Sequence, residues 1–242
     1  MGDKSRIAWT DATWNPVTGC TKVSAGCKHC YAERMAKRLK AMGQKNYANG
    51  FGVTTQPHML DVPLRWKRPR NIFVCSMSDL FHEDVSLDYI LRVFETMRKA
   101  KQHRFQVLTK RSERMAWIAA TIEWPPNVWA GVTTENQAMA DKRIPDLLNV
   151  PAPLLFVSCE PLLGPIDLKM PRACLPQIGW VIAGCESGPG ARHMRKGWTR
   201  SLRDQCQEAS VPFFLKQSIV DCKLTHIPEL DGRKWEEIPK EG

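Results

Sequence analysis

The chain has 242 residues, is 43% hydrophobic and carries a formal net charge of +10. Its length fits one large domain, and it has neither an eighteen-residue apolar run nor a signal-like N-terminus. We therefore expect a cytoplasmic protein, not a membrane-spanning or secreted one. Nine cysteines, an odd number in so long a chain, favour thiols on metal in a reducing compartment over a disulfide framework. The basic charge favours anionic partners such as nucleic acid or nucleotides, with a solvated basic surface as the alternative.

Short apolar, β-branched runs alternate with amphipathic stretches along the chain. The runs predicted as strands are Ile7–Thr10, Ile72–Cys75, Phe105–Leu108, Val128–Val132, Leu154–Val157, Trp180–Ala183 and Pro212–Leu215. The stretches predicted as helices are Tyr31–Met42, Leu87–Lys101, Ser112–Thr121, Asn136–Leu148 and Thr199–Ala209. Apolar strands that alternate with helices are typical of a parallel sheet covered by helices. We therefore predict an α/β protein with a partial (βα)6-type TIM-like barrel over residues 1–218.

The C-terminal residues have a different pattern. Leu230–Trp235 has an Asp-Gly pair near its start, which is typical of a two-residue β-hairpin turn. We expect residues 219–242 to form a small C-terminal hairpin extension packed on the barrel.

Polar residues follow most of the predicted strands. They are Ser76, Ser78, Asp79, Lys110, Thr133, Glu135, Ser158, Glu160, Glu186 and Lys216. Because the loops at the carboxyl ends of barrel strands build the site, we expect these residues to line one polar, cofactor-sized cavity. The candidates for catalysis are Glu160, Glu186, Lys110 and Lys216. Any one set alone is equally typical of loop solvation or helix capping.

Two basic clusters are candidates for contacts with substrate phosphates. One surrounds Trp66 and includes Arg68, and the other contains Arg192, Arg195 and Lys196. The glycine-rich segment 184–192 precedes the second cluster but lacks the spacing of a P-loop or of GxGxxG. Its glycines would let the backbone approach a ligand closely. A metal-free, phosphate-handling α/β enzyme that uses this segment is one alternative function.

Three cysteines in the run TWNPVTGCTKVSAGCKHCYAERMA carry the strongest functional signal. Cys20, Cys27 and Cys30 have the spacing C-x6-C-x2-C, at the point where a loop gives way to a helix. Three thiolates on one loop would hold three corners of a 4Fe–4S cluster and leave the fourth iron open, whereas structural zinc needs a fourth ligand. Cys75, Cys159 and Cys185 lie at the ends of predicted strands, and one of them remains a candidate for a further ligand or a reactive thiol.

These residues and several other stretches resemble the radical SAM superfamily, in which three cysteines after the first strand bind a 4Fe–4S cluster on a partial βα barrel. The first gap has six residues where the superfamily usually has three. The longer gap is similar to that of a narrower group of uncharacterised, phage-associated three-cysteine proteins described as photolyase-like. The resemblance covers most of the chain, through IFVCSMSDLFHEDV, VLTKR, NVWAGVTTENQ, FVSCEPLLGPIDL, VIAGCESGPGARHM and PFFLKQ.

The resemblance implies roles for individual residues. Cys20, Cys27 and Cys30 would ligate three irons, and S-adenosylmethionine would chelate the fourth. His29 or Tyr31 would lie near the adenine, and Ser76, Ser78 or Asp79 near the methionine amine, although the superfamily's GGE triplet is absent there. Thr133 and Glu135 would reach the ribose. Ser158, Glu160 and Glu186 would face the far side of the cavity.

The resemblance also implies a mechanism. One electron from a donor of flavodoxin or ferredoxin type would drive reductive cleavage of S-adenosylmethionine to a 5′-deoxyadenosyl radical, which abstracts hydrogen from the substrate. A nucleobase or nucleic acid is the favoured substrate, and a base in duplex DNA would have to be flipped into the barrel. The main alternative is a non-catalytic zinc or iron–sulfur nucleic-acid-binding protein.

Overall fold

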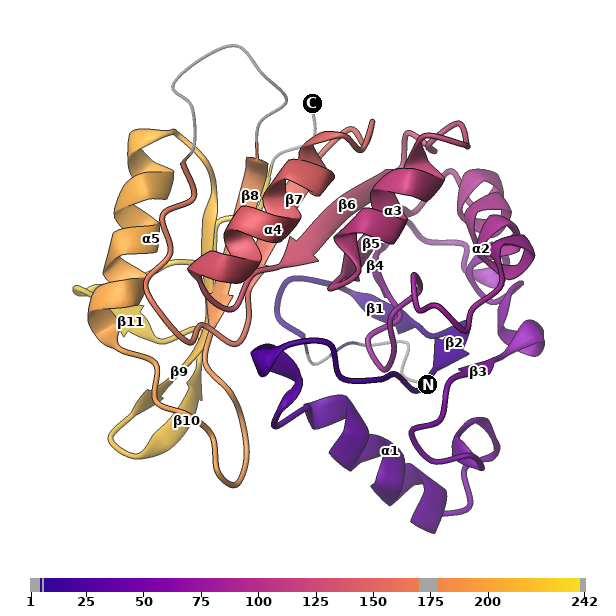
Figure 1. Ribbon diagram of the computed structural model, residues 1–242, viewed down its shortest axis with the longest axis horizontal. Helices are drawn as coiled ribbons and strands as arrows, with labels where there is room; N and C mark the ends of the chain where they lie inside the picture. The colour runs from indigo at the N-terminus through magenta and orange to yellow at the C-terminus, as the bar shows by residue number, and fades with distance from the viewer. Residues whose placement is uncertain (1–4, 6, 170–177, 240–242) are drawn as a thin grey trace.

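The computed structural model describes residues 5, 7–169 and 178–239. Its main sheet has eight strands in the order β1-β4-β5-β6-β7-β8-β9-β10 and curls into a half-barrel (Figure 1). The strands are β1 (Ala12–Trp14), β4 (Asn71–Val74), β5 (Arg104–Thr109), β6 (Val128–Thr133), β7 (Leu155–Cys159), β8 (Ile178–Gly184), β9 (Phe213–Val220) and β10 (Lys223–His226). All neighbours from β1 to β9 pair in parallel, and β10 pairs antiparallel with β9. The predicted partial TIM-like α/β barrel is confirmed.

The helices are α1 (Tyr31–Ala41), α2 (Leu87–Lys99), α3 (Ser112–Ala119), α4 (Gln137–Leu148) and α5 (Lys196–Glu208). Helices α2 to α5 connect parallel strands on the outer side of the sheet, whereas α1 lies at the carboxyl ends of the strands (Figure 1). Ser86 caps α2 by accepting a hydrogen bond from the Tyr89 amide (3.3 Å), and Asn136 caps α4 in the same way. Helix α5 begins three residues before the predicted Thr199. No described helix combines the length and the apolar run needed to cross a lipid bilayer.

The first predicted strand is wrong. Residues 7–10 form a turn in which the Thr10 amide donates to the Ile7 carbonyl (3.2 Å), and the strand is Ala12–Trp14 instead. The Thr10 hydroxyl donates to the carbonyls of Ala12 and Asn71, which fixes the turn beside β4. The apolar residues of this run do not extend the sheet, because Trp9 packs against the concave side of it. An apolar run of four residues predicts burial but not strand pairing.

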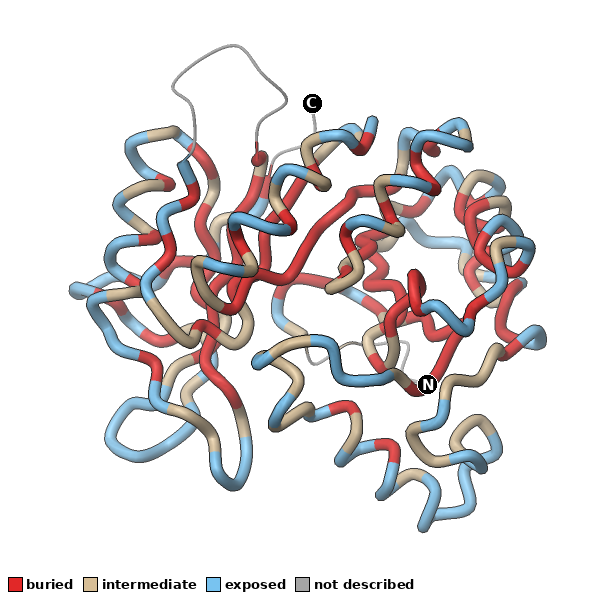
Figure 2. Tube along the Cα trace, viewed as in Figure 1, coloured by how far each residue is buried: buried red, intermediate tan, exposed pale blue. Residues whose placement is uncertain are grey.

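Alternate side chains of each strand face two different layers, as the period of two requires. The outward set packs under the helices. The inward set of Phe73, Trp129, Phe156, Trp180 and Phe214 forms an aromatic floor together with Trp9 from the turn before β1. Trp9 packs against Phe73 and Trp180, with ring centroids 4.8 Å and 5.9 Å apart. Figure 2 shows that β1 and the strands from β4 to β8 are mostly buried, while β10 and α1 are exposed along most of their length. The floor fills the half of the concave face nearer the amino ends of the strands.

The predicted hairpin near the C-terminus is confirmed as β11 (Glu229–Leu230) and β12 (Arg233–Lys234). Asp231 and Gly232 both have positive φ, 56° and 76°, as the favoured two-residue turn requires. Asp231 accepts hydrogen bonds from Arg200 and Arg203 of α5, so the hairpin lies against that helix. A further small sheet pairs β2 (Val17–Thr18) with β3 (Thr54–Thr55) beside the cysteine loop. Short 3-10 helices form at Ala25–Cys27, Lys45–Tyr47, Pro57–Met59 and Pro63–Arg65.

Candidate active site

A cavity of about 620 Å³ lies at the carboxyl ends of the strands. The cysteine loop and α1 pass across this end of the sheet (Figure 1). The predicted site residues that line the cavity are Cys20, Cys27, Cys30, Tyr31, Ser76, Ser78, Asp79, Lys110, Thr133, Ser158, Glu160 and Lys216. Trp9 and Phe73 of the aromatic floor also line it, at the inner end. The structure thus brings most of the predicted residues to one site.

The cysteine loop is fixed at its start by backbone contacts. The amide of Gly19 donates to Met77, and the amide of Cys20 donates to Phe51, both at 3.1 Å. A Cβ at Gly19 would lie 2.2 Å from the Gly52 carbonyl oxygen, and its φ is +80°, so only glycine fits there. The three cysteines that follow are partly exposed free thiols facing the cavity. Burial raises the pKa of the Cys20 thiol to about 11, so a metal there would have to displace its proton.

The donor set fits an iron–sulfur cluster. Three thiols from one loop line one cavity, as a cluster with three protein ligands requires. Among the described residues, no three His, Cys, Asp or Glu side chains converge closely enough to hold a single metal ion. Cys75 lines the same cavity but is 3% exposed, and contacts with the Ser78 side chain and the Val17 backbone surround its thiol. Burial raises the pKa of Cys75 to about 12.

Two clamps hold the middle of the cysteine loop against the barrel. Glu135, fully buried, accepts a hydrogen bond from the Gly26 amide (3.1 Å) and pairs with Arg143 (2.9 Å). Burial opposes ionisation of Glu135, but hydrogen bonds from Ser24 and Gly26 and the Arg143 charge outweigh it and lower its pKa. On the other side, Arg192 donates to the Ala25 carbonyl (2.8 Å) and is held by Glu186. Both carboxylates are therefore occupied in fixing the loop.

A third network joins the loop to β5 through Arg111, a strand-end residue to which the sequence analysis assigned no role. Arg111 donates to the Cys20 sulfur (3.5 Å) and to Asp79 (3.3 Å), and its Nε donates to Glu83 (2.7 Å). Asp79, itself buried, also accepts from the Thr109 hydroxyl (2.7 Å) and the Lys110 amide. The Arg111 hydrogen bond lowers the pKa of Glu83 to about 2. The position of Arg111 directly after the β5 strand end is the signal that would have identified it.

A polar layer stands above the aromatic floor. The Lys110 ammonium donates to the Thr133 hydroxyl (3.3 Å), and the Ser158 hydroxyl donates to Glu160 (3.1 Å). Lys216 pairs with the other Glu160 oxygen at 2.7 Å. Thr133, Ser158 and Lys216 lie on the same inward face as Trp129, Phe156 and Phe214, two or four residues further along each strand. The layer presents hydroxyls and both signs of charge to the cavity.

The serines after β4 and Tyr31 are also fixed. The Tyr31 hydroxyl donates to the Ser76 carbonyl, which ties α1 to this loop. The Ser76 and Ser78 hydroxyls donate to Asn15 (3.2 Å) and to the Val17 carbonyl (2.7 Å). Arg34 of α1 donates to the Ser187 carbonyl (2.5 Å) on the opposite side of the cavity. Asn15 and Arg34 were not predicted, because their partners lie more than sixty residues away.

Eight predicted residues do not line the cavity: the clamp residues Glu135, Glu186 and Arg192, and five others. His29 faces the glycine-rich segment, where a Cβ on Gly190 would lie 3.4 Å from its ring. Arg195 stacks on Trp198, and Lys196 lies 3.7 Å from Asp231. The other two residues are Trp66 and Arg68. Trp66 packs beside His103, and Arg68 precedes β4, so this basic cluster lies at the amino ends of the strands.

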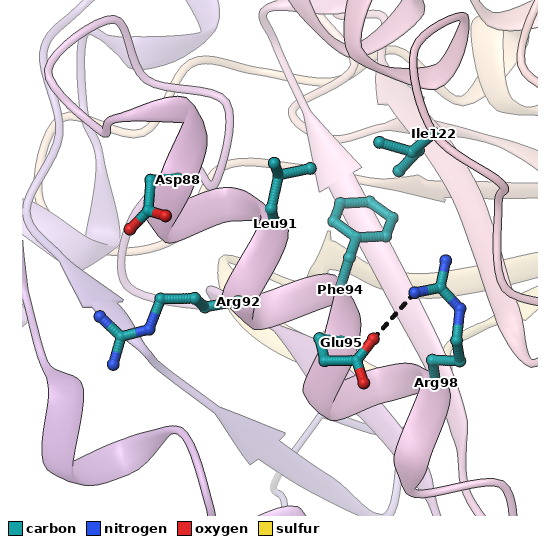
Figure 3. Close-up of a pocket in the computed structure, with 7 residues that line it drawn as sticks. All are labelled: Asp88, Leu91, Arg92, Phe94, Glu95, Arg98 and Ile122. Atoms are coloured by element: carbon teal, nitrogen blue, oxygen red, sulfur yellow. Dashed lines mark hydrogen bonds and ion pairs between the residues drawn. The ribbon is translucent and has the colours of Figure 1, made fainter.

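A shallower depression of about 310 Å³ lies on α2 and contains none of the predicted site residues. Figure 3 shows its lining, with the Glu95–Arg98 pair (2.9 Å) along the helix and Ile122 opposite. Its other polar lining residues, Asp88 and Arg92, belong to the same helix, so its lining brings together no polar groups from different elements. The cavity at the carboxyl ends is therefore the candidate active site.

A family model described as "Protein of unknown function (DUF5131)" matches residues 4–239. The chain belongs to this family. No curated protein matches it. Among solved structures, a cysteine-to-serine mutant of spore photoproduct lyase covers 87% of this chain and 54% of its own, with 14% identity and a TM-score of 0.52. A double mutant of that lyase with bound AdoMet and dinucleoside spore photoproduct covers 86% and 55%, with 13% identity and a TM-score of 0.48. The chain thus spans about half the length of these structures, and the likeness is one of fold.

Proposed function

We propose that the protein is a radical S-adenosylmethionine enzyme that holds a 4Fe–4S cluster on Cys20, Cys27 and Cys30. The observation that carries this proposal is that all three thiols line the cavity containing the polar layer. The fold shared with a spore photoproduct lyase and the resemblance of the sequence to the radical SAM superfamily support it. When bound, the cluster and S-adenosylmethionine would supply a one-electron reductive cleavage that yields a 5′-deoxyadenosyl radical.

The residues of this chain would bind and orient the cofactor. S-adenosylmethionine carries an amine, a carboxylate and ribose hydroxyls, and the cavity offers a carboxylate on Glu160, ammonium groups on Lys110 and Lys216, and hydroxyls on Thr133 and Ser158. Hydrogen bonds to charged groups are the stronger ones, so the lysines and Glu160 would fix the zwitterionic end. His29, Tyr31, Ser76 and Ser78 remain candidates for further cofactor contacts.

Two predicted cofactor ligands are better described as positioning residues. The carboxylates of Asp79 and Glu135 already accept hydrogen bonds from several donors of the chain itself. Each joins the cysteine loop or its supports to a strand end, so each would fix the thiols and not contact the cofactor. The aromatic floor would exclude water from the inner end of the cavity, which protects a reactive radical from side reactions.

A nucleobase or nucleic acid is the proposed substrate class. The net charge of +10 supports it, since such substrates are polyanionic. We propose further that residues 1–218 form the catalytic barrel, with 219–242 as an extension, and that a protein of flavodoxin or ferredoxin type delivers the electron in a reducing compartment. The described cysteines are all free thiols, as such a compartment would leave them.

The proposal is tested by anaerobic reconstitution of the full chain with iron and sulfide. We expect about four irons per chain, an electron paramagnetic resonance spectrum that changes when S-adenosylmethionine is added, and 5′-deoxyadenosine after reduction with dithionite. Cys20→Ala, Cys27→Ala and Cys30→Ala should each abolish the product.

Cys75→Ala is the matched control, because Cys75 lines the same cavity without belonging to the loop. It should retain the cluster and the product. Loss of iron in this variant would identify a fourth protein ligand, and a colourless protein with bound zinc would favour the non-catalytic alternative. Either result overturns the radical mechanism.

A further inference from the structure

A second cavity, of about 600 Å³, lies on the outer side of the cysteine loop between α3 and α4. We call it the α3–α4 groove; the two helices lie side by side over the same face of the sheet (Figure 1). Val23, Lys110 and Arg111 line both the groove and the active-site cavity. Arg111 therefore contacts the groove on one side and donates to the Cys20 sulfur, 3.5 Å away, on the other. The groove is the outer wall of the cysteine site.

Apolar side chains from α3, α4 and the cysteine loop line the groove. Trp117 of α3 is 56% exposed, Val23 of the cysteine loop is 44% exposed, and Met139 of α4 is half-buried. A tryptophan so open to water contributes little to the stability of the barrel, since its ring leaves most of its apolar area unburied. Exposed aromatic and methionine side chains that share one depression are typical of a surface that binds a partner.

The rim of the groove is cationic. Five Lys and Arg side chains line it, against two carboxylates, Glu83 and Glu113. Arg111 and Arg143 are paired with carboxylates and their side chains are only 8% and 3% exposed, so Lys110, Arg114 and Lys142 carry the charge of the rim. Glu83 is held by Arg111. Arg114 donates to backbone carbonyls, including that of Val85 (2.6 Å), so its charge is not neutralised by that contact. Within the described part of the chain, neither Arg114 nor Lys142 forms an ion pair. The groove therefore attracts an acidic surface.

We propose that the α3–α4 groove docks an acidic one-electron donor protein. This inference rests on the proposed function, since only a redox centre at the cysteines gives such a donor a purpose. The donor would lose one electron, the centre on Cys20, Cys27 and Cys30 would gain it, and no proton or bond is exchanged. Transient redox partners meet over small interfaces, and opposite charges speed their encounter. The groove offers such a partner exposed apolar side chains beside cationic ones, and Arg111 joins it to Cys20.

A nucleic-acid strand is the other polyanion that such a surface attracts, because bases stack on exposed aromatic rings. The position of the groove argues against it. Trp117 lines the groove and not the active-site cavity, so a base stacked on its ring would lie outside that cavity. The donor needs only proximity to the cysteines, which the groove provides, whereas a substrate needs entry to the cavity.

The test compares two sources of electrons for the reconstituted full chain. Stopped-flow absorbance follows the oxidation of reduced flavodoxin, and in parallel of reduced ferredoxin, while dithionite supplies electrons without docking. We expect Lys142→Glu and Trp117→Ala each to slow electron transfer from the protein donor about tenfold, and added salt to slow the unaltered protein similarly. Product formation with dithionite should be unchanged. Lys101→Glu reverses an exposed charge at the opposite edge of the sheet and should change neither rate.

The two arms separate this inference from the proposed function. Absence of 5′-deoxyadenosine with dithionite in the unaltered protein contradicts the function itself. With that product present, docking is overturned if neither carrier protein reduces the unaltered chain, or if both groove variants accept electrons at the unaltered rate. It is equally overturned if the variants lose affinity for a labelled single-stranded oligonucleotide while electron transfer is unaffected. Circular dichroism confirms that both variants remain folded.

Discussion

The same strands build both halves of the concave face, but one half is filled by apolar side chains and the other lines an open, polar cavity. Toward the amino ends, inward positions carry Trp129, Phe156 and Trp180, which contact one another and fill the space. Toward the carboxyl ends, the same register places Thr133 and Ser158, which leave a cavity of about 620 Å³. The period of the strand is unchanged, and only the side chains differ.

This contrast shows how the chain divides stability from chemistry. The floor consists of apolar rings whose burial does not depend on pH or on a ligand. The polar half is held by charged networks that tie the cysteine loop to the strand ends. Changes in the floor should therefore act on the whole fold, and changes in the networks should act mainly on the loop.

The largest expected effect comes from removing the central ring of the floor. Trp180 is fully buried, packs on Trp9, Trp129, Phe156 and Phe214, and donates to the Glu237 carbonyl (2.9 Å). Trp180→Ala should lower the free energy of unfolding by about 3–5 kcal/mol, because it opens a cavity that neighbours cannot fill. Urea denaturation measures this. Trp180→Phe is the control and should lose less; equal losses would show that ring volume is not what the floor requires.

The second prediction concerns the clamp on the cysteine loop. Glu135→Gln keeps the shape but removes the charge opposite the buried Arg143, so the variant should lose about 1.5–3 kcal/mol. The loop should loosen as well, which iron retention after desalting of the reconstituted protein would report. Hydrogen exchange at the Gly26 amide gives a readout that does not need the cluster. Unchanged exchange there would show that the carboxylate does not hold the loop.

Much of this architecture could be predicted from sequence, and the failures have physical causes. Six of the seven apolar runs fall on observed strands, because short apolar runs that alternate with amphipathic helices indicate the buried strands of a parallel sheet. The first fails because Ala12–Trp14 is too short to show a period, whereas Ile7–Thr10 is apolar for a different reason: Trp9 seals the floor.

The site was predictable as a set of strand ends but not as a set of contacts. Lys110, Thr133 and Ser158 follow strands and face the cavity, as the register dictates. Asp79 accepts a hydrogen bond from the Thr109 hydroxyl, thirty residues away. This contact depends on how neighbouring loops meet, which local sequence does not encode. The contacts of Arg111 could not be predicted for the same reason, since its partners come from the cysteine loop and from the loop after β4.

The third prediction tests how tightly the floor is packed. A Cβ at Gly131 would lie 2.4 Å from the Phe156 ring, and neither residue can shift without disturbing Trp180. Gly131→Ala should cost about 1–3 kcal/mol through overpacking. The double variant Gly131→Ala/Phe156→Leu should lose less stability than the sum of the two single variants, because the smaller side chain makes room for the methyl group. Additive losses in urea denaturation would contradict this account.

The smallest expected effect is a difference in pH dependence between the charged network around Arg111 and the aromatic floor. Hydrogen bonding to Arg111 lowers the pKa of Glu83 from its ordinary value of 4.5 to about 2, so the folded state binds fewer protons than the unfolded state between these values. The stabilisation is complete above pH 4.5 and is lost as the pH falls toward 2. Because Glu83 is largely exposed, it amounts to less than about 1 kcal/mol. The difference in melting temperature between the unaltered protein and Glu83→Gln should therefore shrink across that window. For Trp180→Phe the difference should stay constant, since no ionisable group of the floor titrates there; parallel pH profiles for the two variants would contradict the division between an apolar floor and a charged network.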